Sequence, residues 1–204
     1  MVFLRSPQPE DYLDSIRAAS IVLRPPSQGD YGAWAELRAA SRVHLTPWEP
    51  AWSRDELVKS SYRRRLRAYA RDVRDDLGYA FFIADAASDT LLGGITLSNV
   101  RRGAAQTASL GYWIGAPCQG RGKMQEAVSA IVPFAFKKLL LHRIEAASML
   151  SNAASLRVLE KTGFQREGVA RQHLKINGVW QDHVLLSRLE TVEDERVFKL
   201  EARS

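Results

Sequence analysis

Short apolar runs and longer stretches of helical spacing follow one another along the chain. The runs typical of strands are bounded by turn residues and cover 21–24, 79–84, 91–97, 107–114, 143–150, 164–175 and 179–186. Apolar residues recur at helical spacing in 28–41, 55–77, 120–141 and 152–162. This order of strand, two helices, three strands, helix, strand, helix and two strands predicts an α+β fold around one mixed sheet.

Turn signals refine this arrangement. The three strand-like segments between 79 and 114 are separated by short turns, so we expect an antiparallel meander. Asn177-Gly178 is a strong hairpin signal between the last two strands. Pro133 removes a hydrogen bond inside the segment 120–141 and is expected to kink that helix, while Gly163 is expected to stop the next one.

The loop 46–52 combines two tryptophans with two prolines. It is too rich in proline for a helix interior and too aromatic for an idle linker. We therefore expect this loop to wall a pocket.

The segment 55–77 predicts a long helix with an apolar stripe and a basic face. The stripe comprises Val58, Leu66, Tyr69, Val73 and Leu77, and the basic face carries Arg64, Arg67, Arg71 and Arg74. The simpler interpretation of the arginines is a solvated surface. The alternative is a weak RNA or ribosome contact through the Arg63–Arg74 helix.

Composition and charge narrow the class of protein. The 204 residues, of which 46% are hydrophobic and 25% charged, predict a single domain over 1–204, with a core at about 21–189 and a peripheral tail, expected to be helical, over 190–204. A net charge of +6 favours anionic partners such as phosphorylated cofactors or RNA. With one cysteine, Cys118, and neither a signal peptide nor a membrane span visible, we expect a soluble cytoplasmic protein. The four histidines lack ligand-type spacing, so no metal site is expected.

The clearest chemical signal is a glycine-rich turn between the strand 107–114 and the helix that follows. Gln119-Gly120-Arg121-Gly122-Lys123-Met124 places two glycines and two cations at a helix start, where free amides and the helix dipole attract an anion. The Walker pattern fails because Pro117 and Met124 stand where it requires Gly and Ser or Thr. The dinucleotide fingerprint fails because Gln125 stands at its third glycine. The residues alone leave open that the glycines merely shape a tight connection.

This turn resembles the Gln/Arg-x-x-Gly-x-Gly/Ala signature of the GCN5-related N-acetyltransferases (GNAT). The segments Ser151-Asn152-Ala153-Ala154-Ser155, Leu159-Glu160-Lys161-Thr162-Gly163-Phe164 and Glu167-Gly168 are similar to the second cofactor segment of that superfamily, at the expected distance. Leu23-Arg24-Pro25, Gly111-Tyr112-Trp113-Ile114 and Gly178-Val179-Trp180-Gln181-Asp182-His183 resemble its RimJ-like subgroup, the ribosomal-protein-alanine N-acetyltransferases. The similarity spans about 21–189 and implies a mostly antiparallel sheet flanked by helices.

The resemblance also implies a cofactor and a set of site residues. The cofactor is acetyl-CoA, with coenzyme A as product, and the implied binding residues are Trp113, Ile114, Gln119, Gly120, Arg121, Gly122, Lys123, Met124, Asn152 and Ser155. In this scheme the turn holds the pyrophosphate, amides near Trp113 and Ile114 polarise the thioester carbonyl, and Asn152 both caps its helix and bonds the pantetheine arm. Ser155 is the implied proton donor to the departing thiolate, with a local helix hydroxyl as the alternative. Cys118 is expected to be a bystander.

Two departures from the family pattern matter. Met124 replaces a small residue, although the backbone amides of the turn remain. Ser109 and Leu110 precede Gly111 where many relatives place a carboxylate base. Glu167, His173 or His183 reached through water are substitutes, none of which the sequence favours.

The missing carboxylate bears on which amine accepts the acetyl group. Freeing an α-amine with a pKa of about 7.7 to 8.0 at neutral pH costs about 1 kcal/mol, against nearly 5 for lysine at about 10.4. The sequence thus favours the N-terminal α-amine of a protein, possibly ribosomal, over a lysine side chain. The alternatives are a small-molecule amine, although the charge of +6 disfavours a polycation, and a basic RNA- or ribosome-binding module without catalysis. The acceptor groove is expected at the loop 48–52 and the Asn177-Gly178 hairpin.

Overall fold

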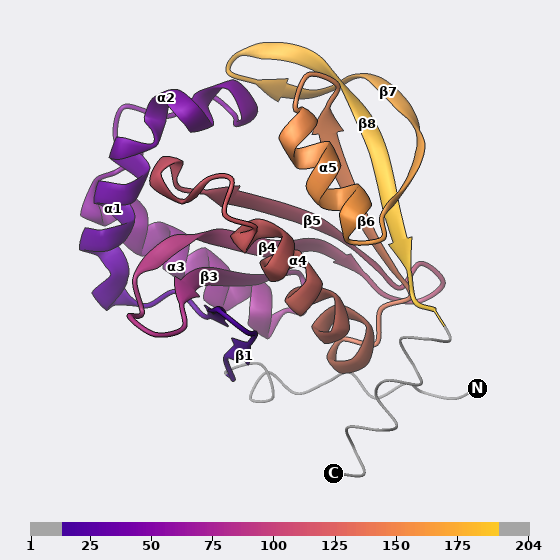
Figure 1. The fold of residues 1–204 in the computed structure, drawn as a ribbon, viewed down its shortest axis with the longest axis horizontal. Helices are drawn as coiled ribbons and strands as arrows, with labels where there is room; N and C mark the ends of the chain where they lie inside the picture. Colours follow the sequence, from indigo (N-terminus) through magenta and orange to yellow (C-terminus); the bar gives the residue numbers. More distant parts are fainter. Residues whose placement is uncertain (1–13, 192–204) are drawn as a thin grey trace.

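A single eight-stranded sheet runs through the part of the chain that the computed structural model describes, residues 14–191, in the order β1-β2-β3-β4-β5-β6-β8-β7 (Figure 1). The strands are β1 (Ile16–Arg17), β2 (Ile21–Arg24), β3 (Tyr79–Asp85), β4 (Leu91–Arg101), β5 (Thr107–Ile114), β6 (Arg143–Met149), β7 (Gln165–Ile176) and β8 (Val179–Leu189). The pairing of β5 with β6 is parallel and every other pairing is antiparallel. The predicted α+β fold, with a mixed and mostly antiparallel sheet, is confirmed.

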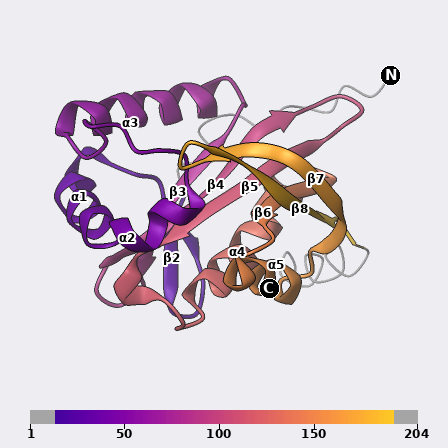
Figure 2. The ribbon, with the colours of Figure 1, turned by 90° about the horizontal axis from the view of Figure 1, so that it is seen from above.

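Helices cover both faces of this sheet. They are α1 (Tyr31–Ala40), α2 (Arg42–Leu45), α3 (Lys59–Arg74), α4 (Lys123–Pro133) and α5 (Ala153–Lys161). Figure 2 shows α3 on one side of the sheet and α4 and α5 on the other. The two faces of the sheet are thus covered by different helices. Because side chains alternate along a strand, neighbouring residues of one strand point to opposite faces.

Side chains alternate between two cores accordingly. The larger core lies against α4 and α5 and takes Phe81 and Ile83 from β3, together with Leu110 from β5. The smaller core lies against α1 and α3 and takes Phe82 from β3, packed with Trp34 and Tyr62. Trp34 and Tyr62 have ring centroids 4.9 Å apart, so this smaller core is largely aromatic.

Most predicted elements are found close to their expected positions. β3, β4 and β5 form the antiparallel meander, and β2 and β5 have the predicted bounds. The helix containing Pro133 gives way there to a π-helical turn, Phe134–Lys138, which is where a missing amide hydrogen was expected to disturb it. Asn177 and Gly178 both have positive φ (43° and 83°) at the tip of the β7–β8 hairpin, as the predicted turn requires.

The helix predicted over 55–77 was too long at both ends. Its first turns are not helical because Val58 is extended and Asp55 folds back to accept hydrogen bonds from Ser61 and Arg64. The expected apolar stripe was wrong at its ends, since Val58 and Leu77 are 44% and 52% exposed. Tyr62, which the stripe omitted, is the buried residue of α3.

The short strand β1 was not predicted, because two residues carry no periodicity. The loop 46–52 begins with a 3₁₀ turn, Thr46–Trp48. The expected helical tail over 190–204 lies almost entirely outside the described residues. Among the helices of residues 14–191, none has the length and apolar character to cross a bilayer.

Candidate active site

The sheet splits where β5 and β6 stop pairing. Their register joins only Thr107–Ser109 of β5 to Arg143–Glu145 of β6, and the strands diverge beyond these pairs (Figure 1). The later residues of β5 therefore lack a strand partner on that side. Peptide groups at such an edge are available to a ligand.

The glycine-rich turn lies after the end of β5 and leads into α4. Gly120 and Gly122 have φ of 69° and 73°, in the left-handed region that glycine tolerates. Within the described chain, no protein group accepts a hydrogen bond from the backbone N–H groups of 120–125, and the next amide, that of Glu126, donates to Gly122 O. The turn thus offers a row of free amides at the positive end of a helix, as an anion site requires.

Side chains at the start of α4 bond to the protein and leave the glycine-rich turn open to a ligand. Lys123 Nζ donates to Ser20 Oγ at 2.8 Å, and Glu126 accepts from Ser20 N–H at 2.6 Å. Lys123 was expected to add charge beside the amides, but its ammonium is directed to the β1–β2 turn, which leaves its backbone N–H for a ligand. Met124 is buried in the large core, so its bulk does not narrow the turn.

Ser155 lies in the first turn of α5, within reach of β5. Asn152 caps that helix, since its side-chain oxygen accepts from Ser155 N–H at 3.1 Å. Tyr112 of β5 reaches Ser155, with 2.9 Å between Tyr112 Oη and Ser155 Oγ and 3.3 Å to Ser155 O. This contact joins β5 to α5, and local patterns could not predict it because 43 residues separate the partners.

Burial raises the pKa of Tyr112 to about 12, although its bond to Ser155 acts in the opposite direction. The phenol therefore stays protonated across the physiological range and remains a hydrogen-bond donor. The segment Gly111-Tyr112-Trp113-Ile114 contains Tyr112, but its motif did not predict the contact with Ser155.

The amides of Trp113 and Ile114 were both expected near the thioester, but the register of β4 and β5 points them in opposite directions. Gly115 N–H donates to Leu92 O, so the alternation of an antiparallel ladder pairs Trp113 N–H with Gly94 and turns Ile114 N–H toward the open edge. Of the two amides, that of Ile114 is thus the one that faces the open edge. Trp113 contributes its indole on the opposite face of the sheet.

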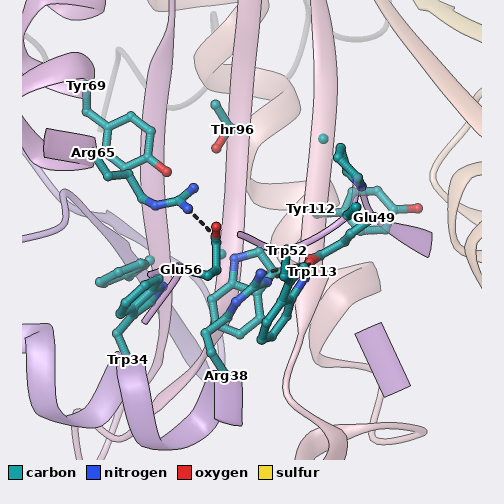
Figure 3. Close-up of a pocket in the computed structure, with 15 residues that line it drawn as sticks. Trp34, Arg38, Glu49, Trp52, Glu56, Arg65, Tyr69, Thr96, Tyr112 and Trp113 are labelled. Atoms are coloured by element: carbon teal, nitrogen blue, oxygen red, sulfur yellow. Dashed lines mark hydrogen bonds and ion pairs between the residues drawn. The ribbon is translucent and has the colours of Figure 1, made fainter. Parts of the chain in front are cut away.

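A cavity of about 430 Å³ lies on that opposite face, over β4 and β5 and beneath α1 and α3 (Figure 3). Its wall includes residues 49–52, which confirms that the Trp-rich loop lines a pocket, although Trp48 is not part of the lining. The tip of the β7–β8 hairpin touches this loop, because Asn177 N–H donates to Glu49 O at 2.9 Å.

One wall of the pocket is a stacked ion pair. Arg38 lies 4.4 Å from the Trp52 ring centroid and 4.9 Å from that of Trp113, and both of its terminal nitrogens bond Glu49 at 2.7 Å. Trp52 Nε1 also donates to Glu49, at 2.8 Å. Gly94 makes room for this stack, since a Cβ there would lie 2.5 Å from the Trp113 indole nitrogen.

The second carboxylate of the pocket is Glu56. It is bound by Arg65 at 2.6 Å, and Figure 3 shows the carboxylate reaching into the middle of the pocket between Arg65 and the two indoles of the stack. Glu56 precedes α3, where the sequence had predicted helix, so its role was not anticipated.

None of the three substitute bases lines the pocket. Glu167 is held by Arg143 beside the paired part of β5 and β6, and the hydrogen bonds from Arg143 and Ser187 lower its pKa to about 2. His183 is buried, with Nδ1 2.9 Å from Gln181 O, and His173 packs against it. Cys118 is half-buried beside the large core.

Comparison with known proteins agrees with this geometry. Residues 20–165 match the Acetyltransferase (GNAT) domain family. The probable N-acetyltransferase YjcK of Bacillus subtilis is 37% identical over 88% of this chain and 99% of its own length. The [ribosomal protein uS5]-alanine N-acetyltransferase of Escherichia coli is 35% identical over 76% of this chain and 81% of its own. The structure of Mycobacterium smegmatis RimJ in complex with CoA-disulfide superimposes with a TM-score of 0.82 at 27% identity, covering 93% of this chain and 96% of that one.

The matched domain defines an acyltransferase, and the chain belongs to the GNAT acetyltransferase family. It is an N-acetyltransferase that uses acetyl-CoA, of the RimJ-like kind. The free amides of 120–125 fit a diphosphate, and the diverging edge of β5 fits an extended arm. Acetyl-CoA supplies the activated acetyl group of the reaction.

Proposed function

We propose that this enzyme acetylates the N-terminal α-amine of a protein, with a ribosomal protein as the first candidate. The observation that carries the proposal is the pocket face of β5, where Ser109, Gly111 and Trp113 supply no carboxylate. An acceptor that frees its own amine near neutral pH suits such a face, whereas lysine does not. The uS5-alanine N-acetyltransferase of E. coli, 35% identical to this chain, makes a ribosomal protein the first to test.

Different residues are proposed to bind different parts of acetyl-CoA. The amides of Gly120, Arg121, Gly122, Lys123 and Met124 bind the diphosphate, with Gln119 shaping the turn through its bond to Ala116 O at 3.3 Å. Ile114 N–H orients the acetyl carbonyl, Trp113 walls the acceptor side, and Asn152 lies at the mouth near the pantetheine arm. Ser155 holds the proton that the departing thiolate takes.

Acetylation of peptides that differ only in their first residue tests the proposal. With acetyl-CoA and purified enzyme, thiol release is expected with free N-termini and not with peptides whose N-terminus is already blocked. Mass spectrometry of the products is expected to place the acetyl group on the α-nitrogen. Acetylation confined to lysine side chains, or to small amines, would contradict it.

A basic stripe beside the pocket supports a second partner. Arg63, Arg67 and Arg71 follow one another at four-residue spacing on the exposed side of α3, and no ion pair or side-chain hydrogen bond engages them within residues 14–191. Their neighbours Arg64, Arg65 and Arg74 are paired with acids instead. Like charges at this spacing destabilise a helix, so we propose that the stripe contacts RNA phosphates near the acceptor.

Replacing Arg63, Arg67 and Arg71 together by glutamine is expected to lower RNA affinity about tenfold and to reduce the slope of log affinity against log salt by roughly 2 to 3. Filter binding over a salt series measures both. The matched control replaces Arg64 and Arg74, which lie on the same helix but have acidic partners. Losses in proportion to the charges removed, three against two, would show a general charge effect rather than a contact by the stripe.

A further inference from the structure

The pocket beneath α1 and α3 has several groups able to receive a cationic amine, but most are already used. The three tryptophans of the lining already face a guanidinium, since Arg38 lies 4.4 Å from the Trp52 ring and 4.9 Å from the Trp113 ring, and Arg65 lies 5.6 Å from the Trp34 ring. A second cation over these rings would meet a guanidinium of the same charge. The rings therefore shape the pocket without binding an ammonium group.

Both carboxylate oxygens of Glu49 already accept hydrogen bonds from the protein. Arg38 Nη1 bonds its Oε1, while Arg38 Nη2 and Trp52 Nε1 bond its Oε2, all at 2.7 to 2.8 Å. The pair is mostly shielded from solvent, with the Arg38 side chain 7% exposed. Withdrawing Glu49 from it would leave a buried guanidinium without its partner, which costs several kcal/mol in comparable cases.

Glu56 differs in that one of its oxygens is nearly free. Oε1 accepts from Arg65 at 2.6 Å, but the partner of Oε2 is the exposed Ser53 hydroxyl at 3.4 Å, the limit of a hydrogen bond. The Glu56 side chain is 21% exposed and directed into the pocket (Figure 3). Among the lining residues of the described chain, it is the carboxylate with capacity left.

We propose that Glu56 Oε2 binds the α-ammonium group of the incoming acceptor and brings it to the β4–β5 face of the pocket. The inference rests on the proposed function, because it assumes an acceptor that arrives charged. Arg65 then serves as a positioning residue that holds Oε1 and turns Oε2 inward. The carboxylate that the strand lacks at Ser109 is thus supplied from the loop before α3, for binding rather than as a strand base.

Binding of an acceptor peptide and of its des-amino analogue, in which hydrogen replaces the α-amine, isolates this contact. Calorimetry in the presence of coenzyme A avoids turnover. The wild-type enzyme is expected to bind the amine about 10- to 100-fold more tightly than the analogue, the range of a charged hydrogen bond. In Glu56→Gln that preference is expected to fall below about threefold, with affinity for the analogue unchanged.

Two further variants and a change of pH serve as controls for this experiment. Glu36→Gln, an exposed glutamate on α1 that does not line the pocket, is the matched control and should behave as wild type. Glu56→Asp keeps the charge but shortens the reach, so it should also lose the preference even if Glu56→Gln folds poorly. Raising the pH from 7 to 9 should weaken wild-type binding of the amine and leave the glutamine variant unaffected.

Two results would overturn the inference. One is a preference for the amine that survives in both variants; the other is an equal loss of affinity for amine and analogue, which indicates a structural role. If no peptide is acetylated but a small primary amine is, the proposed function fails. The same comparison with that amine and its des-amino analogue then still tests Glu56.

Discussion

Replacing Gly122 by alanine is expected to weaken acetyl-CoA binding by about tenfold or more while leaving the enzyme folded. Gly122 precedes α4 with φ of 73°, a conformation that costs an L residue about 1 to 2 kcal/mol. The space around its Cβ is open, so the strain comes from the backbone alone. The turn can relieve it by rotating its peptide groups, which directs the free amides away from a common anion. Calorimetric titration with coenzyme A measures the loss.

Gly103 provides the matched control for this substitution. It has almost the same φ, 66°, and an equally open Cβ position, but it lies in the β4–β5 turn. Gly103→Ala is expected to lower the melting temperature as much as Gly122→Ala and to leave coenzyme A affinity unchanged. If Gly122→Ala bound coenzyme A normally, the amides of 120–125 would not be the diphosphate site.

The contrast between what the sequence predicted and what it missed follows from the range of the interactions involved. The β3–β5 meander, the Asn177-Gly178 turn and the break at Pro133 depend on residues within a few positions of one another. The ends of α3 were misjudged because long-range contacts decide them. Asp55, for instance, bonds Arg64 instead of continuing the helix.

The same difference between local and long-range interactions explains which residues of the candidate site could be predicted. The glycine-rich turn and the Asn152 cap are local motifs, so their residues could be named in advance and their geometry agrees. The bond from Tyr112 to Ser155 and the use of Glu56 as a pocket residue arise only when distant segments meet. The charge of Lys123 was expected beside the amides, and this was wrong because its side chain bonds Ser20, a partner 103 residues away.

Ser155→Ala is expected to lower kcat by about 100-fold, the lower end of the range for a positioned proton donor, with the KM for acetyl-CoA changed by less than threefold. The alanine variant loses the hydroxyl but keeps the backbone N–H that Asn152 caps, so α5 should remain intact. Steady-state kinetics with a peptide acceptor measure the effect. An unchanged kcat would reduce Ser155 to a local helix hydroxyl.

Tyr112→Phe then separates a relay from an independent role. Tyr112 Oη can donate to Ser155 O at 3.3 Å while accepting from Ser155 Oγ at 2.9 Å, so its proton can turn to Ser155 as Ser155 gives up its own. Removing the phenol should cost about tenfold in kcat at most, less than the roughly 100-fold lower end for a positioned proton donor, because Tyr112 acts behind Ser155. Because it would act only through Ser155, the double variant should be no slower than Ser155→Ala alone. Additive losses would make Tyr112 a proton donor in its own right. With its pKa raised to about 12 by burial, Tyr112 stays protonated from pH 6 to 10, so its ionisation should leave no falling limb in the wild-type rate over that range.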